Sequence, residues 1–94
     1  MAAKKLIFSN HAVKQMFQRS ISVDDVKFVL KNGILVNDYP DDKPLPSKLL
    51  FADCNGRSLH VVCSENSSEN ETIVITAYEA SPDIWENDFV TRKK

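Results

Sequence analysis

The sequence predicts an α+β fold in which two N-terminal helices pack on a four-stranded antiparallel sheet. Helical periodicity is confined to the first third of the chain, and strand-like alternation follows it. The dipeptide Asn55-Gly56 joins two of the strand-like segments, which is typical of a β-hairpin. A chain of 94 residues holds one two-layer core, so we expect residues 1–94 to form a single domain.

Two capped amphipathic helices are expected at the start of the chain. Ser9 is the expected N-cap of the first helix, over residues 10–19, and its apolar face is formed by Ala12, Val13, Met16 and Phe17. Ser22 caps the second helix, in which Asp24 and Asp25 favour the positive end of the helix dipole. Gly33 ends this helix. The short link between the helices makes them packed neighbours.

The rest of the chain indicates strands and turns. The expected strands cover residues 34–38, 48–53, 58–64 and 72–78. Prolines and aspartates in residues 39–46 indicate a loop, and residues 65–70 are polar and turn-like. Residues 82–90 are compatible with either a strand or a short helix.

The Asn55-Gly56 turn predicts the register of the central hairpin. The expected pairs are Cys54 with Arg57, Phe51 with His60, and Lys48 with Cys63. The two cysteines then lie ~20 Å apart along the strands, whereas a disulfide needs Cα atoms within ~7 Å. We therefore predict no disulfide and no shared metal site, and we expect both cysteines to act as small core residues.

Alternation along the strands divides the sheet into two faces. The face expected to meet the helices carries Leu50, Ala52, Cys54, Leu59, Val61, Cys63, Ile73, Ile75 and Ala77. The opposite face carries Leu49, Phe51, Asp53, Ser58, His60, Val62, Thr72, Val74, Thr76 and Tyr78. This second face is too apolar for plain solvent exposure and too polar for a core, so we expect a groove on it.

Composition and charge restrict the function classes. A hydrophobic content of 43% and a charged content of 27% are typical of a globular protein, and a net charge of −1 argues against a strongly basic nucleic-acid binder. Lys4, Lys5, Lys14 and Arg19 nevertheless occur in the first twenty residues without an acid, and residues 92–94 are basic. No apolar run approaches the ~20 residues of a membrane helix, so we expect a cytoplasmic protein without membrane contact.

Several segments together carry a resemblance to a known family. They are HAVKQMFQRSIS, YPDDKP, NGRSLHVV, IVITAYE and PDIWENDF, and with them the chain resembles the domain-of-unknown-function family 4258 from Ser9 to Arg92. That family is similar to RelE-like toxins of the barnase, EndoU, colicin and RelE group of metal-independent ribonucleases. The resemblance implies a RelE-like fold, RNA as substrate and a cognate antitoxin as partner. The chain departs from the family pattern at Gln15 (commonly arginine), Ser20 (commonly glycine) and Ala80 (usually proline).

The resemblance also implies a set of site residues. RNA cleavage without a metal needs a base, an acid and cations around the phosphorane. The implied catalytic residues are His60, Tyr78 and His11, and the implied RNA-binding residues are Arg19, Arg57 and Thr76. Lys14, on the polar side of the first helix, is added to the predicted RNA-binding residues. No metal-ligand spacing, glycine-rich phosphate loop or nucleophilic serine motif occurs, so neither a metal nor a cofactor is expected.

Structural roles compete with these assignments. His60 is equally suited to packing against Phe51 across the hairpin, and Arg19 to pairing with Asp24 or Asp25. The leading hypothesis is a small metal-independent endoribonuclease of toxin–antitoxin type. The alternative is a non-catalytic interaction module that binds a partner protein or nucleic acid. The charge around the groove discriminates between the two, because a ribonuclease needs a basic rim.

Overall fold

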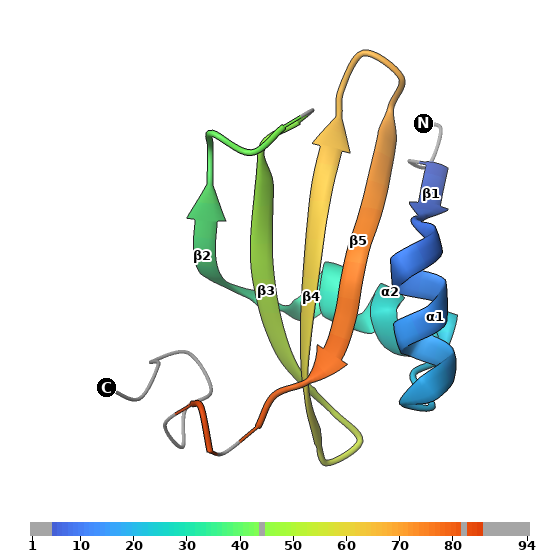
Figure 1. The fold of residues 1–94 in the computed structure, drawn as a ribbon, viewed down its shortest axis with the longest axis vertical. Helices are drawn as coiled ribbons and strands as arrows, with labels where there is room; N and C mark the ends of the chain where they lie inside the picture. The colour runs from blue at the N-terminus through green and yellow to red at the C-terminus, as the bar shows by residue number, and fades with distance from the viewer. Residues whose placement is uncertain (1–4, 44, 82, 86–94) are drawn as a thin grey trace.

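A computed structural model describes residues 5–43, 45–81 and 83–85 of the chain. The elements are β1 (Lys5–Phe8), α1 (Asn10–Gln18), α2 (Val23–Asn32), β2 (Ile34–Tyr39), β3 (Ser47–Cys54), β4 (Arg57–Asn66) and β5 (Glu71–Glu79), shown in Figure 1. Most of residues 82–90 lies outside the described residues, as do Lys4 and the basic residues 92–94.

The prediction of a four-stranded antiparallel sheet is wrong. Among the described residues, the sheet has five strands in the order β1-β5-β4-β3-β2, and β1 runs parallel to β5. Only four residues form β1, too few to show alternation, and its partner lies more than sixty residues further along the chain. Sequence periodicity detects local patterns, so a short strand with a distant parallel partner gives no such signal.

Both predicted helices are confirmed, together with their caps. The Ser9 hydroxyl accepts a hydrogen bond from the Ala12 N–H at 3.0 Å. At α2, the Asp25 N–H donates to the Ser22 hydroxyl and the Ser22 N–H donates to the Asp25 carboxylate, both at 3.0 Å. In this reciprocal capping box, the backbone N–H groups of Ser22 and Asp25 both find side-chain acceptors. Ser20, between the helices, has φ +55°, in the left-handed region that favours glycine.

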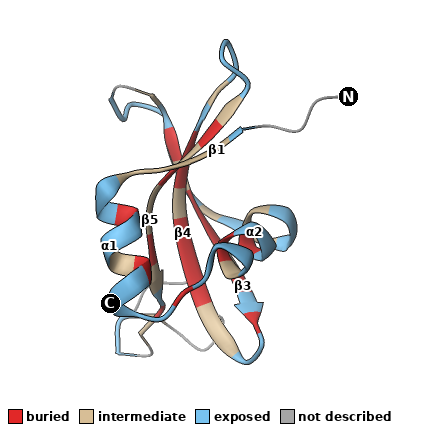
Figure 2. Cartoon of the chain, turned by 90° about the vertical axis from the view of Figure 1, so that its right-hand side faces the viewer, coloured by how far each residue is buried: buried red, intermediate tan, exposed pale blue. Residues whose placement is uncertain are grey.

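The two helices lie on the same side of the sheet (Figures 1 and 2). α1 packs on β5, and α2 packs on β3 and β4. The core between the layers includes Ala12, Met16, Val26, Val29, Leu59, Val61 and Val74. The predicted apolar face of α1 is only half buried, because Val13 and Phe17 are exposed by 54% and 88%.

The hairpin register is confirmed at every predicted pair. Cys54 lies opposite Arg57, Phe51 opposite His60, and Lys48 opposite Cys63. Asn55 and Gly56 have φ values of +53° and +83°, as a type I′ turn requires. Cys54 and Cys63 are buried thiols at opposite ends of the hairpin, which confirms their predicted place in the core.

A β-bulge overturns part of the predicted face assignment in β5. Val62 pairs with Thr76 and Cys63 with Val74, so Ile75 is the extra residue. The bulge reverses the alternation, because one added residue moves all that follow to the opposite face. Val74 and Thr72 are therefore buried, with Val74 in the core, whereas Ile73 and Ile75 are only half-buried.

Ser9 ties this bulge to the start of α1. Its N–H donates to the Val74 carbonyl at 3.0 Å, and its hydroxyl donates to the Ile75 carbonyl at 2.8 Å. A bulge leaves backbone groups without ladder partners. The serine that caps α1 thus also satisfies the carbonyl of the bulged residue.

Candidate functional site

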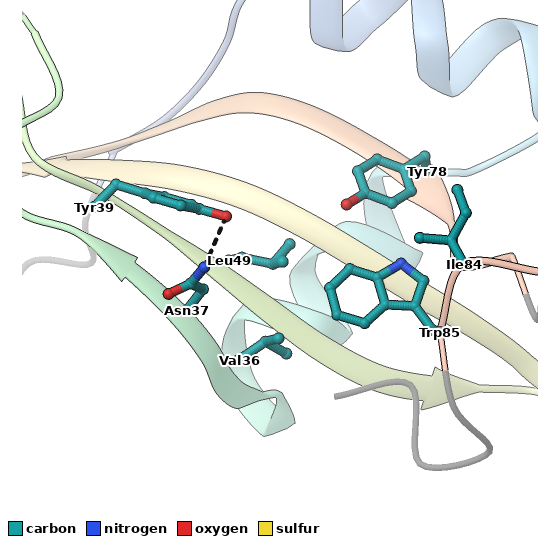
Figure 3. A pocket seen from close by; sticks show the side chains of 7 residues that line it. All are labelled: Val36, Asn37, Tyr39, Leu49, Tyr78, Ile84 and Trp85. Atoms are coloured by element: carbon teal, nitrogen blue, oxygen red, sulfur yellow. Dashed lines mark hydrogen bonds between the residues drawn. The ribbon is translucent and has the colours of Figure 1, made fainter. Parts of the chain in front are cut away.

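A pocket lies on the sheet face opposite the helices, called the open face below. Its volume is about 350 Å³, and its wall is formed by Val36, Asn37, Tyr39, Leu49, Tyr78, Ile84 and Trp85 (Figure 3). The wall combines side chains from β2, β3 and β5 with two from the segment after β5. The sequence predicted a groove on this face, and the pocket lies there.

A second bulge positions the β2 side of the pocket. Leu35 pairs with Leu50 and Asn37 with Leu49, so Val36 is the extra residue in β2. Asn37 and Tyr39 consequently share the face of Leu49 and contribute polar groups to the wall. The Asn37 side-chain amide donates to the Tyr39 hydroxyl at 3.4 Å.

His60 lies in the sheet next to this pocket and has no exposed surface. Its Nδ1 lies 3.2 Å from the Tyr78 hydroxyl. The rings of Phe51, Tyr78 and Trp85 contact it edge to face, with centroid distances of 5.8, 5.3 and 4.6 Å, respectively. The Phe51 contact matches the packing role that the register indicated. Two members of this cluster, Tyr78 and Trp85, also line the pocket wall.

The other predicted site residues are divided between the two sides of the sheet. Thr76 lies on the open face with His60 and Tyr78, since His60 pairs with Tyr78 and Thr76 lies two residues before Tyr78 in β5. His11, Lys14 and Arg19 are exposed on or beside α1, on the helical side. The structure therefore brings His60, Tyr78 and Thr76 together and places the predicted cations elsewhere.

Arg57 is held on the helical side by the corner between α1 and α2. Its guanidinium donates to the Arg19 carbonyl at 2.8 Å and to the Ser20 carbonyl at 2.9 Å. It also forms an ion pair with Glu79 at 3.3 Å. These bonds cover carbonyls at the end of a helix, which are otherwise without partners. The geometry gives Arg57 a structural role that ties the helical layer to the hairpin.

Asp25 and Cys54 form a polar contact between α2 and the sheet. The Cys54 thiol donates to the Asp25 carboxylate at 3.3 Å. The backbone N–H of Ser22 is the main cause that lowers the pKa of Asp25. Burial, followed by the bond to Asp25, raises the pKa of the Cys54 thiol. Cys54 is therefore a protonated donor at neutral pH, and a thiol in this state is a weak nucleophile.

Sequence reasoning missed Asn37 and Trp85 as parts of the pocket. The bulge at Val36 is not visible in the alternation of β2, so the face of Asn37 could not be assigned. Trp85 lies in a segment whose secondary structure was ambiguous. The available signal was its type, because a tryptophan beside a half-apolar sheet face is a natural cover for it.

Within the described ranges, no group of three or more His, Cys, Asp or Glu residues is arranged to hold a metal ion. No helix in those ranges is long and apolar enough to cross a membrane.

Comparison with known families gives one result. A family model described as "Domain of unknown function (DUF4258)" matches residues 8–79, and the chain belongs to this family. The match covers the β2, β3 and β5 walls of the pocket, whereas Ile84 and Trp85 lie beyond it. No curated protein and no solved structure matches the chain. The RelE-like resemblance stays a prediction.

Proposed function

We propose that the protein is a non-catalytic interaction module whose open-face pocket receives an aromatic or large apolar side chain of a partner protein. The observation that carries this proposal is the character of the wall, which is uncharged at every described position and includes three aromatic side chains, Tyr39, Tyr78 and Trp85. Aromatic walls favour edge-to-face contacts with an inserted ring. The Asn37 amide and the Tyr39 hydroxyl are suited to bond the backbone of the inserted residue.

The charges near the pocket favour a protein over RNA. Asp41, Asp42 and one lysine, Lys43, follow Tyr39 and Pro40 in the chain, and Asp83 precedes Ile84. Nucleic-acid affinity depends mainly on cations that neutralise phosphates. Arg57, the predicted phosphate ligand, lies on the other side of the sheet and is bonded to backbone carbonyls. A ribonuclease would need a basic rim, so these charges make the open-face pocket more similar to a protein-docking surface than to the cleft of a nuclease.

Trp85 provides the measurement, because it is the only tryptophan of the chain and lines the pocket. Its emission should change and saturate when capped Gly-Phe-Gly peptide is added, and should stay constant with Gly-Ala-Gly. Tyr39→Ala should weaken this response about tenfold, as expected for an aromatic contact residue. Val13→Ala, on the helical side, is the matched control and should leave it unchanged. A saturable response to single-stranded RNA, with none to the phenylalanine peptide, would overturn the proposal.

One observation favours the ribonuclease as the second candidate. His60 and Tyr78 are bonded to each other, and Tyr78 reaches the pocket wall, so a proton-transfer pair borders a cavity. This candidate requires cleavage of RNA by the wild-type protein in the presence of a chelator. It also requires loss of cleavage in Tyr78→Phe, a variant that keeps the ring packing. Wild-type inertness toward several RNAs removes this candidate and leaves the first untouched.

A further inference from the structure

The open-face pocket carries polar groups at two opposite ends. Asn37 and Tyr39 come from β2 at one end, and Tyr78 comes from β5 at the other, while β3 and β4 lie between these strands in the sheet. The hydroxyls of Tyr39 and Tyr78 point into the pocket from opposite sides (Figure 3). The rest of the wall is formed by Val36, Leu49, Ile84 and Trp85. A ligand that fills the pocket therefore needs an apolar body with a polar group at each end.

A buried histidine fixes the position of the Tyr78 hydroxyl. Nδ1 of His60 lies 3.2 Å from the Tyr78 oxygen, and His60 has no exposed surface. The two rings also contact each other edge to face, with their centroids 5.3 Å apart. A phenol hydroxyl both donates and accepts, so its bond to one partner leaves it able to bond a second. The Tyr78 hydroxyl is thus a pre-positioned polar group that serves His60 and a ligand together.

The charge of the wall limits what the polar end of a ligand is. Every described residue of the wall is uncharged. A carboxylate, an ammonium or a phosphate loses its hydration on entering such a pocket, and no opposite charge in the wall compensates for the loss. The ligand group that meets Tyr78 is therefore neutral.

A plain phenyl ring satisfies only part of this pocket. When the backbone of the inserted residue bonds Asn37 and Tyr39, the far end of its ring is directed across the pocket at Tyr78. A phenyl C–H at that place removes water from the Tyr78 hydroxyl and gives no hydrogen bond in return, which lowers affinity. A phenol hydroxyl at the same place either donates to Tyr78 or accepts from it. It consequently fits whichever ring nitrogen of His60 carries the proton.

We propose that the side chain received by the open-face pocket is an unmodified tyrosine of the partner protein, recognised by the hydroxyl of Tyr78. This inference rests on the proposed function, because it names the residue that enters the same pocket. The tyrosine ring packs against Leu49 and Trp85, and its hydroxyl forms a hydrogen bond with Tyr78. A site built to bond a hydroxyl discriminates against the analogue that lacks it. Tyr78 is thus the residue that determines specificity.

The experiment compares capped Gly-Tyr-Gly, Gly-Phe-Gly and Gly-phosphotyrosine-Gly peptides on the full chain. Emission of Trp85 is followed, with excitation at a wavelength that tyrosine does not absorb. We expect the tyrosine peptide to bind about tenfold more tightly than the phenylalanine peptide, as one hydrogen bond in a partly buried site provides. The phosphotyrosine peptide should bind at least about tenfold more weakly than the tyrosine peptide, because its charge meets no cation in the wall.

Two matched substitutions locate the contact, since each removes one hydroxyl and keeps the ring. Tyr78→Phe should bring the affinities of the tyrosine and phenylalanine peptides to within about twofold of each other. Tyr39→Phe removes the hydroxyl at the opposite end, so it should weaken both peptides together and keep their ratio at about ten. Far-UV circular dichroism and urea denaturation show that both variants are folded before the titrations are compared.

The contrary outcomes are specific. Equal affinities of the wild type for the tyrosine and phenylalanine peptides would overturn the inference, and so would tighter binding of the phosphotyrosine peptide. A tyrosine preference that survives in Tyr78→Phe, or that is lost in Tyr39→Phe, would also overturn it. In all these cases saturable binding of the phenylalanine peptide leaves the proposed function standing. Binding of none of the peptides would overturn the proposed function, and the inference with it.

Discussion

The two faces of the sheet are closed by different means. On the helical face, Leu59, Val61 and Val74 are fully buried beneath α1 and α2, and the contacts are aliphatic. On the open face, His60 is equally buried, but the cover is a set of aromatic rings that includes Trp85. The two helices bury the central strands of their face, whereas a few large side chains leave a pocket directly on the open face. A face that is buried by rings instead of a whole element keeps room for a ligand.

The largest expected effect comes from deleting the same side chain on each face. Leu59→Ala on the helical face should lower the free energy of unfolding by about 3–5 kcal/mol, because a closed core retains the cavity. Leu49→Ala, on the pocket wall, should cost only about 2 kcal/mol, because the vacated space opens into a pocket that water reaches. Both leucines are almost fully buried, at 0% and 3% exposure. Urea denaturation measures the difference, and equal losses would show that the faces are equally closed.

Ser9 tests how the helical layer is attached to the sheet. Ser9→Ala removes the α1 cap, at a cost of about 1 kcal/mol, and the bond to the bulge carbonyl, at about 1 kcal/mol more. We expect a total loss of about 2 kcal/mol in urea denaturation. Ser9→Thr keeps the hydroxyl and should remain close to wild type. A loss in the threonine variant as large as in the alanine variant would show that the hydroxyl is not responsible.

Asp25, through the backbone N–H of Ser22, and Cys54, through its burial, make the stability of the helical side depend on pH. The pKa of Asp25 is lowered in the folded protein, so its contribution is present above the unfolded-state pKa and is lost as the pH falls below about 4. The pKa of Cys54 is raised, so its contribution is present at neutral pH and is lost as the pH rises above about 9. The free energy of unfolding should therefore decline at both extremes.

The variant Asp25→Asn isolates this contribution. Its unfolding free energy, measured in urea from pH 3 to 10, should depend less on pH near 4 than that of the wild type. Asp24→Asn, at the exposed neighbouring position, is the matched control and should follow the wild-type curve. Identical acid slopes for the wild type and Asp25→Asn would contradict the assignment.

The smallest expected effect is a gain at the corner between the helices. Ser20 is left-handed, a conformation that costs a side-chain-bearing residue about 1 kcal/mol, and glycine adopts it freely. Because glycine also adds entropy to the unfolded chain, Ser20→Gly should stabilise the protein by only about 0.5 kcal/mol in thermal or urea unfolding. A loss of stability would mean that the serine side chain itself contributes to the corner.

Local chemistry explains which parts of the fold could be predicted. Both serine caps and the Asn55-Gly56 turn act over a few residues, so the two helices and the hairpin register were read correctly from the chain. The register also placed His60 opposite Phe51. The same local logic accounts for the glycine that the family resemblance led us to expect at position 20, since Ser20 has a left-handed backbone.

The errors arise where distant parts of the chain decide the structure. Bulges at Val36 and Ile75 move residues between faces, and each depends on the neighbouring strand. Periodicity places Phe17 on the apolar side of its helix, yet its side chain is left 88% exposed. The site was predicted in part. The open face and Tyr78 were anticipated, but the predicted cations lie on the other side of the sheet.

The parallel pairing of β1 with β5 also has a kinetic consequence. The Ser9–Ile75 bond joins residues 66 positions apart, and β1 has only β5 as a neighbour in the sheet. Contacts between such distant positions slow folding, because a long loop must close before they form. During synthesis, α1 and α2 leave the ribosome well before β5. β1 can pair with β5 only after β5 has been synthesised, so we expect completion of the sheet to be a late event in folding.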